Sequence, residues 1–442
     1  MKITFLNHAS FIIQEKYFKL CCDPYLFGSA FNNGFNLLKE EDHEEQLKNL
    51  THIFFSHEHP DHFAISFLKK INENQRTKIT ILYQETFDKR IKKFCEGLGY
   101  NFIELKNKLL FNLNEDVSII CGKVPVYDSW INFKIKNLNI LNVNDCVLEN
   151  PSSINEIKKI LKNKVDILFT NFSYASYAAT KSLRVNNANN QLLTIKKQDE
   201  IIKPKFTVPF ASFIYFSNIE NKYMNDNINS VMAVYKYMIK NCKSKITIMR
   251  PNQEWDGTSE VSNDESIKYW NRIYENIENL NYHSELSTAA DSKLIEKSKN
   301  YISALREKNN FLIIKILRLI GFFKDINIFL LDKNKFFKFN IETGLKEIKF
   351  ENKNSESLIS LHSNSLAFIF DYDYGFDTLL VNARFQTNSK YFQVVKKTFI
   401  LGPLNNTGRY LKLSELHKYL DKSFIIRCLE IVGIKKRINP VS

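Results

Sequence analysis

The first 170 residues alternate short apolar runs with segments whose apolar residues recur at helical spacing. The runs at 2–6, 10–14 and 18–23 predict an opening meander of strands. Later runs predict strands at 51–56, 78–83, 117–121, 130–135, 138–143 and 165–170. Helical spacing predicts helices at 63–74, 87–97 and 154–162. This mixture is typical of a layered α/β fold.

Beyond residue 170 the pattern is weaker. Residues 172–190 are rich in Ser, Ala and Asn and predict loops, whereas 228–241 and 267–280 predict helices. Apolar runs at 366–371 and 378–383 predict strands.

The polar segment 257–265 (G-T-S-E-V-S-N-D-E) predicts a domain boundary. We expect an N-terminal α/β domain at 1–256 and a C-terminal α+β extension at 257–442, helical first and then strand-rich. The most apolar stretch, 311–331, contains three basic residues and one acidic residue. It is too charged to span a bilayer, so no transmembrane segment is expected, and it predicts a domain-packing helix or an amphipathic membrane-surface helix.

Composition is that of a folded globular protein, with 44% hydrophobic and 25% charged residues in 442. The 12 glycines are few, and no Gly-rich phosphate loop is present. The net charge of +14 suits an anionic substrate or an acidic electron donor. No run of five or six like charges and no helix-turn-helix or zinc-finger spacing occurs, so nucleic acid is not an expected partner.

The sequence has seven cysteines, an odd number, and no C-x-x-C motif. A disulfide framework or a cysteine-based zinc site is therefore not expected. The apolar N-terminal run is broken by Asn7 and His8, too early for a signal peptide. These features predict reduced thiols and a cytoplasmic location.

The strongest chemical signal directly follows the apolar run 51–56. The sequence S-H-E-H-P-D-H-F brings His57, His59, Asp61 and His62 together. Residues two apart in an extended segment point the same way, so His57 and His59 form one cluster. Asp61 and His62 can turn towards an adjacent point. Imidazole and carboxylate donors suit zinc or iron, so a site for one or two divalent metal ions is predicted.

Two other residues are candidates near this motif. Asp145 follows the apolar run 138–143 and reaches a sheet edge, where it is either a ligand or a solvated carboxylate. His8, in N-H-A-S-F, is either a contact to the site or its substrate, or a buried structural residue. The remaining histidines are interpreted as ordinary surface or core residues: His43, His52, His283, His362 and His417.

These motifs resemble the metallo-β-lactamase fold family and, within it, the catalytic portion of CMP-N-acetylneuraminate hydroxylase. The likeness rests on S-H-E-H-P-D-H-F and on D-P-Y-L-F-G-S-A-F-N-N-G-F-N-L-L, I-L-N-V-N-D-C and V-P-F-A-S-F, and covers about 1–255. It implies an αββα sandwich with a metal site at its edge. It also implies that Asp23 braces the metal loop. The implied metal ligands are His57 and His59 on one ion, Asp61 and His62 on the other, and Asp145 between them.

The sequence departs from this pattern at two ligand positions. Val124 stands where the family supplies a third histidine to the first metal, and Phe210 where a late histidine would bind the second. Asp128 is a candidate replacement ligand. The hydroxylase also carries a Rieske cluster bound by C-x-H and C-x-x-H pairs, and this sequence contains neither. An oxygenase would therefore need an external ferredoxin-like electron donor.

Three functions remain open, and the first two make the chain an enzyme. The first is an iron oxygenase that hydroxylates an anionic sugar or sugar nucleotide in glycan biosynthesis. The second is a zinc- or manganese-dependent hydrolase of a lactone, phosphodiester or amide, with Asp61 as the catalytic residue that orients a hydroxide. The third is a non-catalytic binding module whose site is eroded at Val124.

Overall fold

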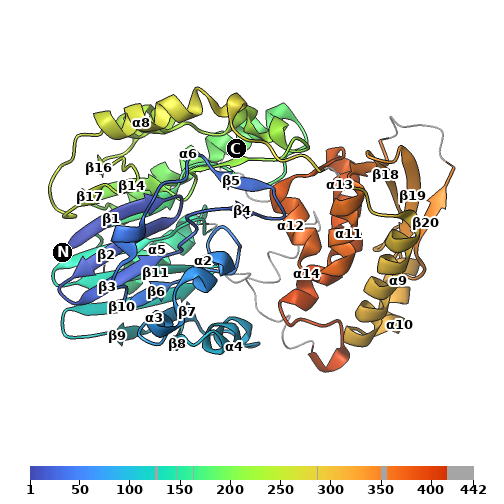
Figure 1. Ribbon diagram of the computed structural model, residues 1–442, viewed down its shortest axis with the longest axis horizontal. Coiled ribbons are helices and arrows are strands. Elements are labelled where there is room, and N and C mark those ends of the chain that lie inside the picture. Colours follow the sequence, from blue (N-terminus) through green and yellow to red (C-terminus); the bar gives the residue numbers. More distant parts are fainter. Residues whose placement is uncertain (125–127, 147, 163, 286, 350–355, 416–442) are drawn as a thin grey trace.

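The computed structural model describes the whole chain except residues 125–127, 147, 163, 286, 350–355 and 416–442. Two seven-stranded sheets form the N-terminal part, and a third, small sheet lies beside them (Figure 1). The small sheet contains β4 (Ser29–Ala30), β5 (Phe35–Leu37) and β15 (Ile214–Phe216).

The first large sheet has the strand order β17-β1-β2-β3-β6-β7-β8. Its strands are β1 (Lys2–Asn7), β2 (Ser10–Glu15), β3 (Phe18–Cys22), β6 (His52–Phe54), β7 (Thr80–Gln84), β8 (Asn101–Leu105) and β17 (Glu254–Trp255). The opening meander is antiparallel, whereas β3, β6, β7 and β8 run parallel. The end of β3 therefore lies beside the end of β6, where the histidine motif begins.

The second large sheet has the order β16-β14-β13-β12-β11-β10-β9. Its strands are β9 (Leu110–Asn112), β10 (Val117–Lys123), β11 (Ser129–Ile135), β12 (Leu138–Asn142), β13 (Ile167–Asn171), β14 (Phe206–Phe210) and β16 (Lys245–Ile246). β12 ends close to Asp145, so this sheet brings the carboxylate to the same edge as the motif.

Alternating side chains explain the layers, because successive residues of a strand face opposite sides of the sheet. In and beside β6, Phe54 enters the core between the sheets, whereas Ile53 and Phe55 join the outer core. The first sheet is covered by α1 (Glu44–Leu47), α2 (Ile65–Lys70), α3 (Glu73–Arg76) and α4 (Arg90–Gly97), and the second by α5 (Pro151–Ile160) and α6 (Lys181–Ile202). The αββα sandwich is confirmed.

Two further helices belong to the core between the sheets, α7 (Val231–Asn241) and α8 (Asp264–Tyr274). Trp270 of α8 stacks on Phe213 at a centroid distance of 4.0 Å. α8 therefore packs with the sandwich although it lies beyond residue 256. The division into 1–256 and 257–442 stays a prediction.

The C-terminal part has its own core around a five-stranded sheet of order β20-β19-β18-β21-β22. Its strands are β18 (Ile326–Leu330), β19 (Lys335–Asn340), β20 (Gly344–Ile348), β21 (Ile359–Leu361) and β22 (Phe385–Gln386). Its helices are α9 (Asp291–Lys308), α10 (Phe311–Leu319), α11 (Ser363–Asp371), α12 (Gly375–Asn382), α13 (Ser389–Phe399) and α14 (Leu401–Asn406). The expected α+β extension is therefore present.

Four local predictions are wrong in whole or in part. The runs 366–371 and 378–383 lie in helices α11 and α12, because a short apolar run does not distinguish a buried strand from a buried helix. Residues 172–190 were predicted to be loops, but α6 begins at Lys181. Its first turns contain several asparagines, which have a low helix propensity, so the sequence did not predict a helix there. The apolar stretch 311–331 divides into α10 and β18. Within the described ranges, no helix combines the length and apolarity that crossing a membrane requires.

Candidate metal centre

The motif is held by hydrogen bonds from the end of β3. Asp23 follows β3, and its backbone N–H donates to the carbonyl of Phe54 at 2.9 Å. Its carboxylate accepts from the Ser56 N–H and the Ser56 hydroxyl, both at 2.7 Å, and from His62 Nδ1 at 3.1 Å. Asp23 therefore braces the loop that carries the histidine motif.

This network assigns the histidine tautomers. Asp23 accepts hydrogen bonds only, so its partner His62 carries a proton on Nδ1 and turns Nε2 to the site. The Ser56 hydroxyl donates to Asp23 and therefore accepts from Nδ1 of His57, 2.9 Å away. Both histidines thus use Nδ1 for the hydrogen bond and turn Nε2 towards the site, the arrangement typical of metal-binding histidines.

One cluster of potential ligand atoms comes from His57, His59 and Asp145. His57 Nε2 lies 2.9 Å from His59 Nδ1 and 3.7 Å from Asp145 Oδ2. Two donors that are each about 2.1 Å from a shared ion, at angles near 90–110°, lie about 3.0–3.4 Å apart. The observed separations are close to this range, so the cluster is the right size for one ion.

A second cluster comes from His8, Asp61 and His62, all of them buried. Asp61 Oδ2 lies 3.5 Å from His8 Nε2 and 4.0 Å from His62 Nε2. Asp145 lies between the two clusters, because its Oδ2 is also 3.6 Å from His62 Nε2. The structure therefore brings all five predicted ligand residues together and adds His8.

Several polar atoms of these clusters are buried without a hydrogen bond. Among the described residues, both ring nitrogens of His8, Nε2 of His62 and one carboxylate oxygen each of Asp61 and Asp145 lack partners. A buried polar group without a partner costs about 1–3 kcal/mol. Nε2 of His8 and Nε2 of His62 lie 3.5 and 4.0 Å from Asp61 Oδ2, so a divalent cation among these atoms would give both nitrogens a partner. The residues present therefore fit a metal centre.

The protonation states of the first cluster favour the binding of a cation. Burial lowers the pKa of His57 and of His59, so both imidazoles are neutral near pH 7. The pKa of Asp145 is lowered: burial raises it, but the adjacent His57 and His62 outweigh that effect. Neutral imidazoles and an ionised carboxylate are the protonation states that metal ligands need.

His62 behaves differently because carboxylates surround it. Burial alone lowers its pKa, but Asp145, Asp61 and Asp23 together raise the pKa of His62 to about 10. Burial raises the pKa of Asp61, but the charge of His62 and the contact with His8 together lower it. Without an ion, a proton on His62 thus balances the buried carboxylates.

The structure shows where the two residues that replace family histidines lie. Val124 packs against the outer core of the second sheet, and Phe210 is buried between the sheets, 5.2 Å from the ring of Phe169. Asp128 is in neither ligand cluster, although its charge acts on His59. The proposal that Asp128 is a substitute ligand gains no support.

The C-terminal part contacts the turn that packs against the motif. The ring of Phe31 lies edge-on to His59 at a centroid distance of 5.3 Å. The carbonyl of Phe31 accepts from Asn382 at 3.0 Å, and that of Asn32 accepts from Arg384 at 2.8 Å. Figure 1 shows α12, which contains Asn382, on the side that faces the N-terminal sheets. These contacts carry no sequence motif, so sequence reasoning missed them.

A second contact reaches the loop itself. Arg90 of α4 binds Glu58, which lies between His57 and His59, at 3.0 Å, and also donates to Asn406 of α14 at 2.7 Å. The C-terminal part and the metal loop are therefore joined through one arginine.

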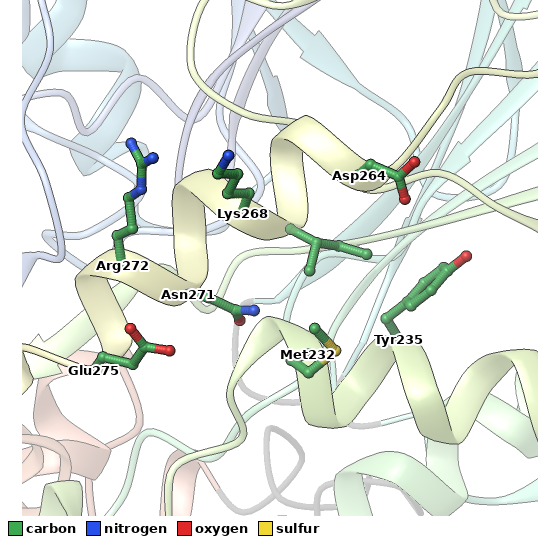
Figure 2. A pocket seen from close by; sticks show the side chains of 8 residues that line it. Met232, Tyr235, Asp264, Lys268, Asn271, Arg272 and Glu275 are labelled. Carbon is green, nitrogen blue, oxygen red and sulfur yellow. The ribbon is translucent and has the colours of Figure 1, made fainter.

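An open groove between α7 and α8 lies elsewhere (Figure 2). Met232 and Tyr235 line one side, and charged residues of both signs on α8 line the other. None of the candidate ligands lines it, and its mixed charges define no ligand class.

Fold, loop and ligand geometry together define the class: the N-terminal part is a metallo-β-lactamase-like domain. Residues 2–170 match the family model of the beta-lactamase superfamily domain.

Among curated proteins, the chain is similar to cytidine monophosphate-N-acetylneuraminic acid hydroxylases. The Xenopus laevis protein is 25% identical over 263 residues, which are 56% of this chain and 44% of the relative. The Danio rerio protein is 24% identical over 269 residues, 55% of this chain and 44% of the relative. The chain thus spans less than half the length of these relatives.

Solved structures similar to the chain include two with different activities in their names. CmlA, a diiron beta-hydroxylase from Streptomyces venezuelae, is 11% identical with a TM-score of 0.41, over 57% of this chain and 53% of CmlA. A possible metal-dependent hydrolase from Veillonella parvula is 13% identical with a TM-score of 0.42, over 58% of this chain and 98% of that one.

Proposed function

We propose that the chain is an iron-dependent oxygenase that hydroxylates an anionic substrate, with His57, His59, Asp61, His62 and Asp145 as its metal ligands. The observation that carries this proposal is the first cluster, in which two imidazoles and one carboxylate converge. That donor set, with open coordination positions, is characteristic of non-haem iron oxygenases.

Iron bound there would activate O2 for insertion of one oxygen atom into a C–H bond. The residues of the chain set the conditions for this chemistry. The Ser56 and Asp23 hydrogen bonds fix the orientation of His57 and His62, and Asp145 holds negative charge between the two clusters. Phe31 shields one side of His59 from water.

The reaction needs two electrons from outside this chain, because the other oxygen atom of O2 leaves as water. A ferredoxin-like protein is the proposed donor, since such proteins are acidic and this chain carries a net charge of +14. The same charge supports an anionic substrate. The names of the curated relatives specify a substrate of this kind, a cytidine monophosphate-linked acid, which we propose as the substrate class here.

A hydrolase is the second candidate, favoured by the unpaired carboxylate oxygen of Asp61 beside the second cluster. With zinc or manganese bound, Asp61 would orient a hydroxide formed from water whose pKa the ion lowers to about 7. Metal identity separates the two functions.

The test is anaerobic reconstitution with Fe(II), followed by metal analysis, Mössbauer spectroscopy and O2 consumption with a chemical reductant. We expect the iron of the first cluster to be lost in His57→Ala and in Asp145→Ala and kept in His52→Asn, since His52 is a histidine of β6 outside both clusters. Tightly bound zinc without O2 consumption would favour the hydrolase. Failure to bind any metal would favour a non-catalytic binding module.

A further inference from the structure

The second ligand cluster contains a histidine that the motif does not supply. We infer that His8 is a ligand of the second metal ion, and that it completes with Asp61 and His62 a site of two imidazoles and one carboxylate. This inference rests on the proposed function, because it presumes that the motif binds metal.

The position of His8 is the first argument. His8 lies in the turn between β1 and β2, 49 positions before His57 in the sequence. In space its Nε2 is 3.5 Å from Asp61 Oδ2, and its ring lies edge-on to His62 at a centroid distance of 5.5 Å. These separations suit ligands of one ion.

The hydrogen bonding of His8 is the second argument. Its side chain is buried, yet neither ring nitrogen has a hydrogen-bond partner among the described residues. A structural core histidine normally uses at least one nitrogen, as His43 does with Asn252 at 2.7 Å. The contact of its Nε2 with Asp61 Oδ2 is long for a hydrogen bond at 3.5 Å, and a cation between the two atoms would give both a close partner.

The backbone of His8 is also held in an unusual conformation. His8 has φ 38°, a left-handed conformation that is unfavourable for most residues other than glycine. Two hydrogen bonds hold it there: its N–H donates to Asn7 Oδ1 at 3.0 Å, and its carbonyl accepts from the Ala211 N–H at 2.8 Å. Strain that is maintained in this way is typical of functional sites. Here it directs the imidazole to Asp61.

The test counts Co(II) ions by calorimetric titration of the metal-free protein and follows the visible absorption of bound Co(II). We expect two ions in the wild type, and one in both His8→Ala and His8→Asn. Asn tolerates the left-handed conformation, so the Asn variant separates loss of the imidazole from disruption of the turn. His43→Ala is the matched control, a buried histidine outside both clusters, and we expect it to keep two ions.

The outcomes separate this inference from the proposed function. Two ions in both His8 variants, with unchanged affinity and spectrum, would overturn the role of His8 and leave the proposed function intact. A single wild-type ion that survives both His8 substitutions but not His57→Ala would do the same. No Co(II) or Fe(II) binding to the wild type would overturn the proposed function itself.

Discussion

Replacing Asp23 by Asn tests whether hydrogen bonding behind the metal loop controls metal affinity. Asp23 accepts three hydrogen bonds, from the Ser56 N–H, the Ser56 hydroxyl and His62 Nδ1. Asn has the same shape and keeps one acceptor for the Ser56 N–H. Its NH2 group, however, then faces the hydroxyl and the imidazole, which are both donors in the wild type.

To bind an ion, His62 must free Nε2 and keep its proton on Nδ1, and the new NH2 group opposes that arrangement because it offers Nδ1–H no acceptor. Loss of such a partner behind a metal ligand typically lowers metal affinity about 10–100-fold, or about 1.4–2.7 kcal/mol. The metal-free protein should also lose about 1–3 kcal/mol of stability, because a buried donor is left unpaired.

Chelator competition with Co(II) measures the affinity, and urea unfolding of the metal-free protein measures the stability. Asp166→Asn is the matched control: Asp166 accepts the Asn139 N–H at 2.8 Å, far from the motif. We expect this control to lose some stability but no metal affinity. If Asp23→Asn binds Co(II) as tightly as the control does, the proposed tautomer control is wrong.

Two other predictions concern proton release and the turn at Phe31. Burial lowers the pKa of His62, but Asp145, Asp61 and Asp23 raise it to about 10, so His62 is protonated in the metal-free protein at pH 7.5. Binding of an ion to the second cluster should therefore release about one proton at that pH. The affinity for the metal ion should therefore rise as the pH increases towards 10. Calorimetry in buffers of different ionisation enthalpy measures the number of protons released. Metal binding without proton release would contradict this prediction. Gly34→Ala should destabilise the protein by about 1–3 kcal/mol in urea unfolding, because a new Cβ would lie 2.3 Å from Asn382 Cβ. Gly97→Ala, with open space around its Cβ, is the control, and equal stability of the two variants would show that the contact yields easily.

The motif was visible in the sequence because its determinants are local. His57, His59, Asp61 and His62 follow one apolar strand within six residues, and the ligand clusters contain all four. Most strands of the two large sheets were also predictable, since they are short apolar runs between turns. The short or exposed strands at their edges, β8, β9, β16 and β17, were not predicted, nor was β14. The fold then supplied Asp145 from the end of β12, where strand-end reasoning had placed it.

The features that the sequence could not predict depend on contacts between distant residues. The sequence left the role of His8 open between a site contact and a structural residue, because only the pairing of β1 with β2 and the approach of Ala211 direct it to Asp61. The apolar runs in α11 and α12 are short enough to be typical of buried strands as well as of buried helices. Their helical form is decided by packing in the C-terminal core, which no local pattern encodes.

The contact between Asn382 and Phe31 joins residues that are 351 positions apart in the chain. Contacts of such separation form late, because a long loop must close before they contribute. The turn that carries Phe31 therefore receives its hydrogen bond from Asn382 only after α12 has been synthesised and has docked. We expect a ribosome-bound N-terminal part to hold metal ions loosely, and the centre to mature only when most of the chain has left the ribosome.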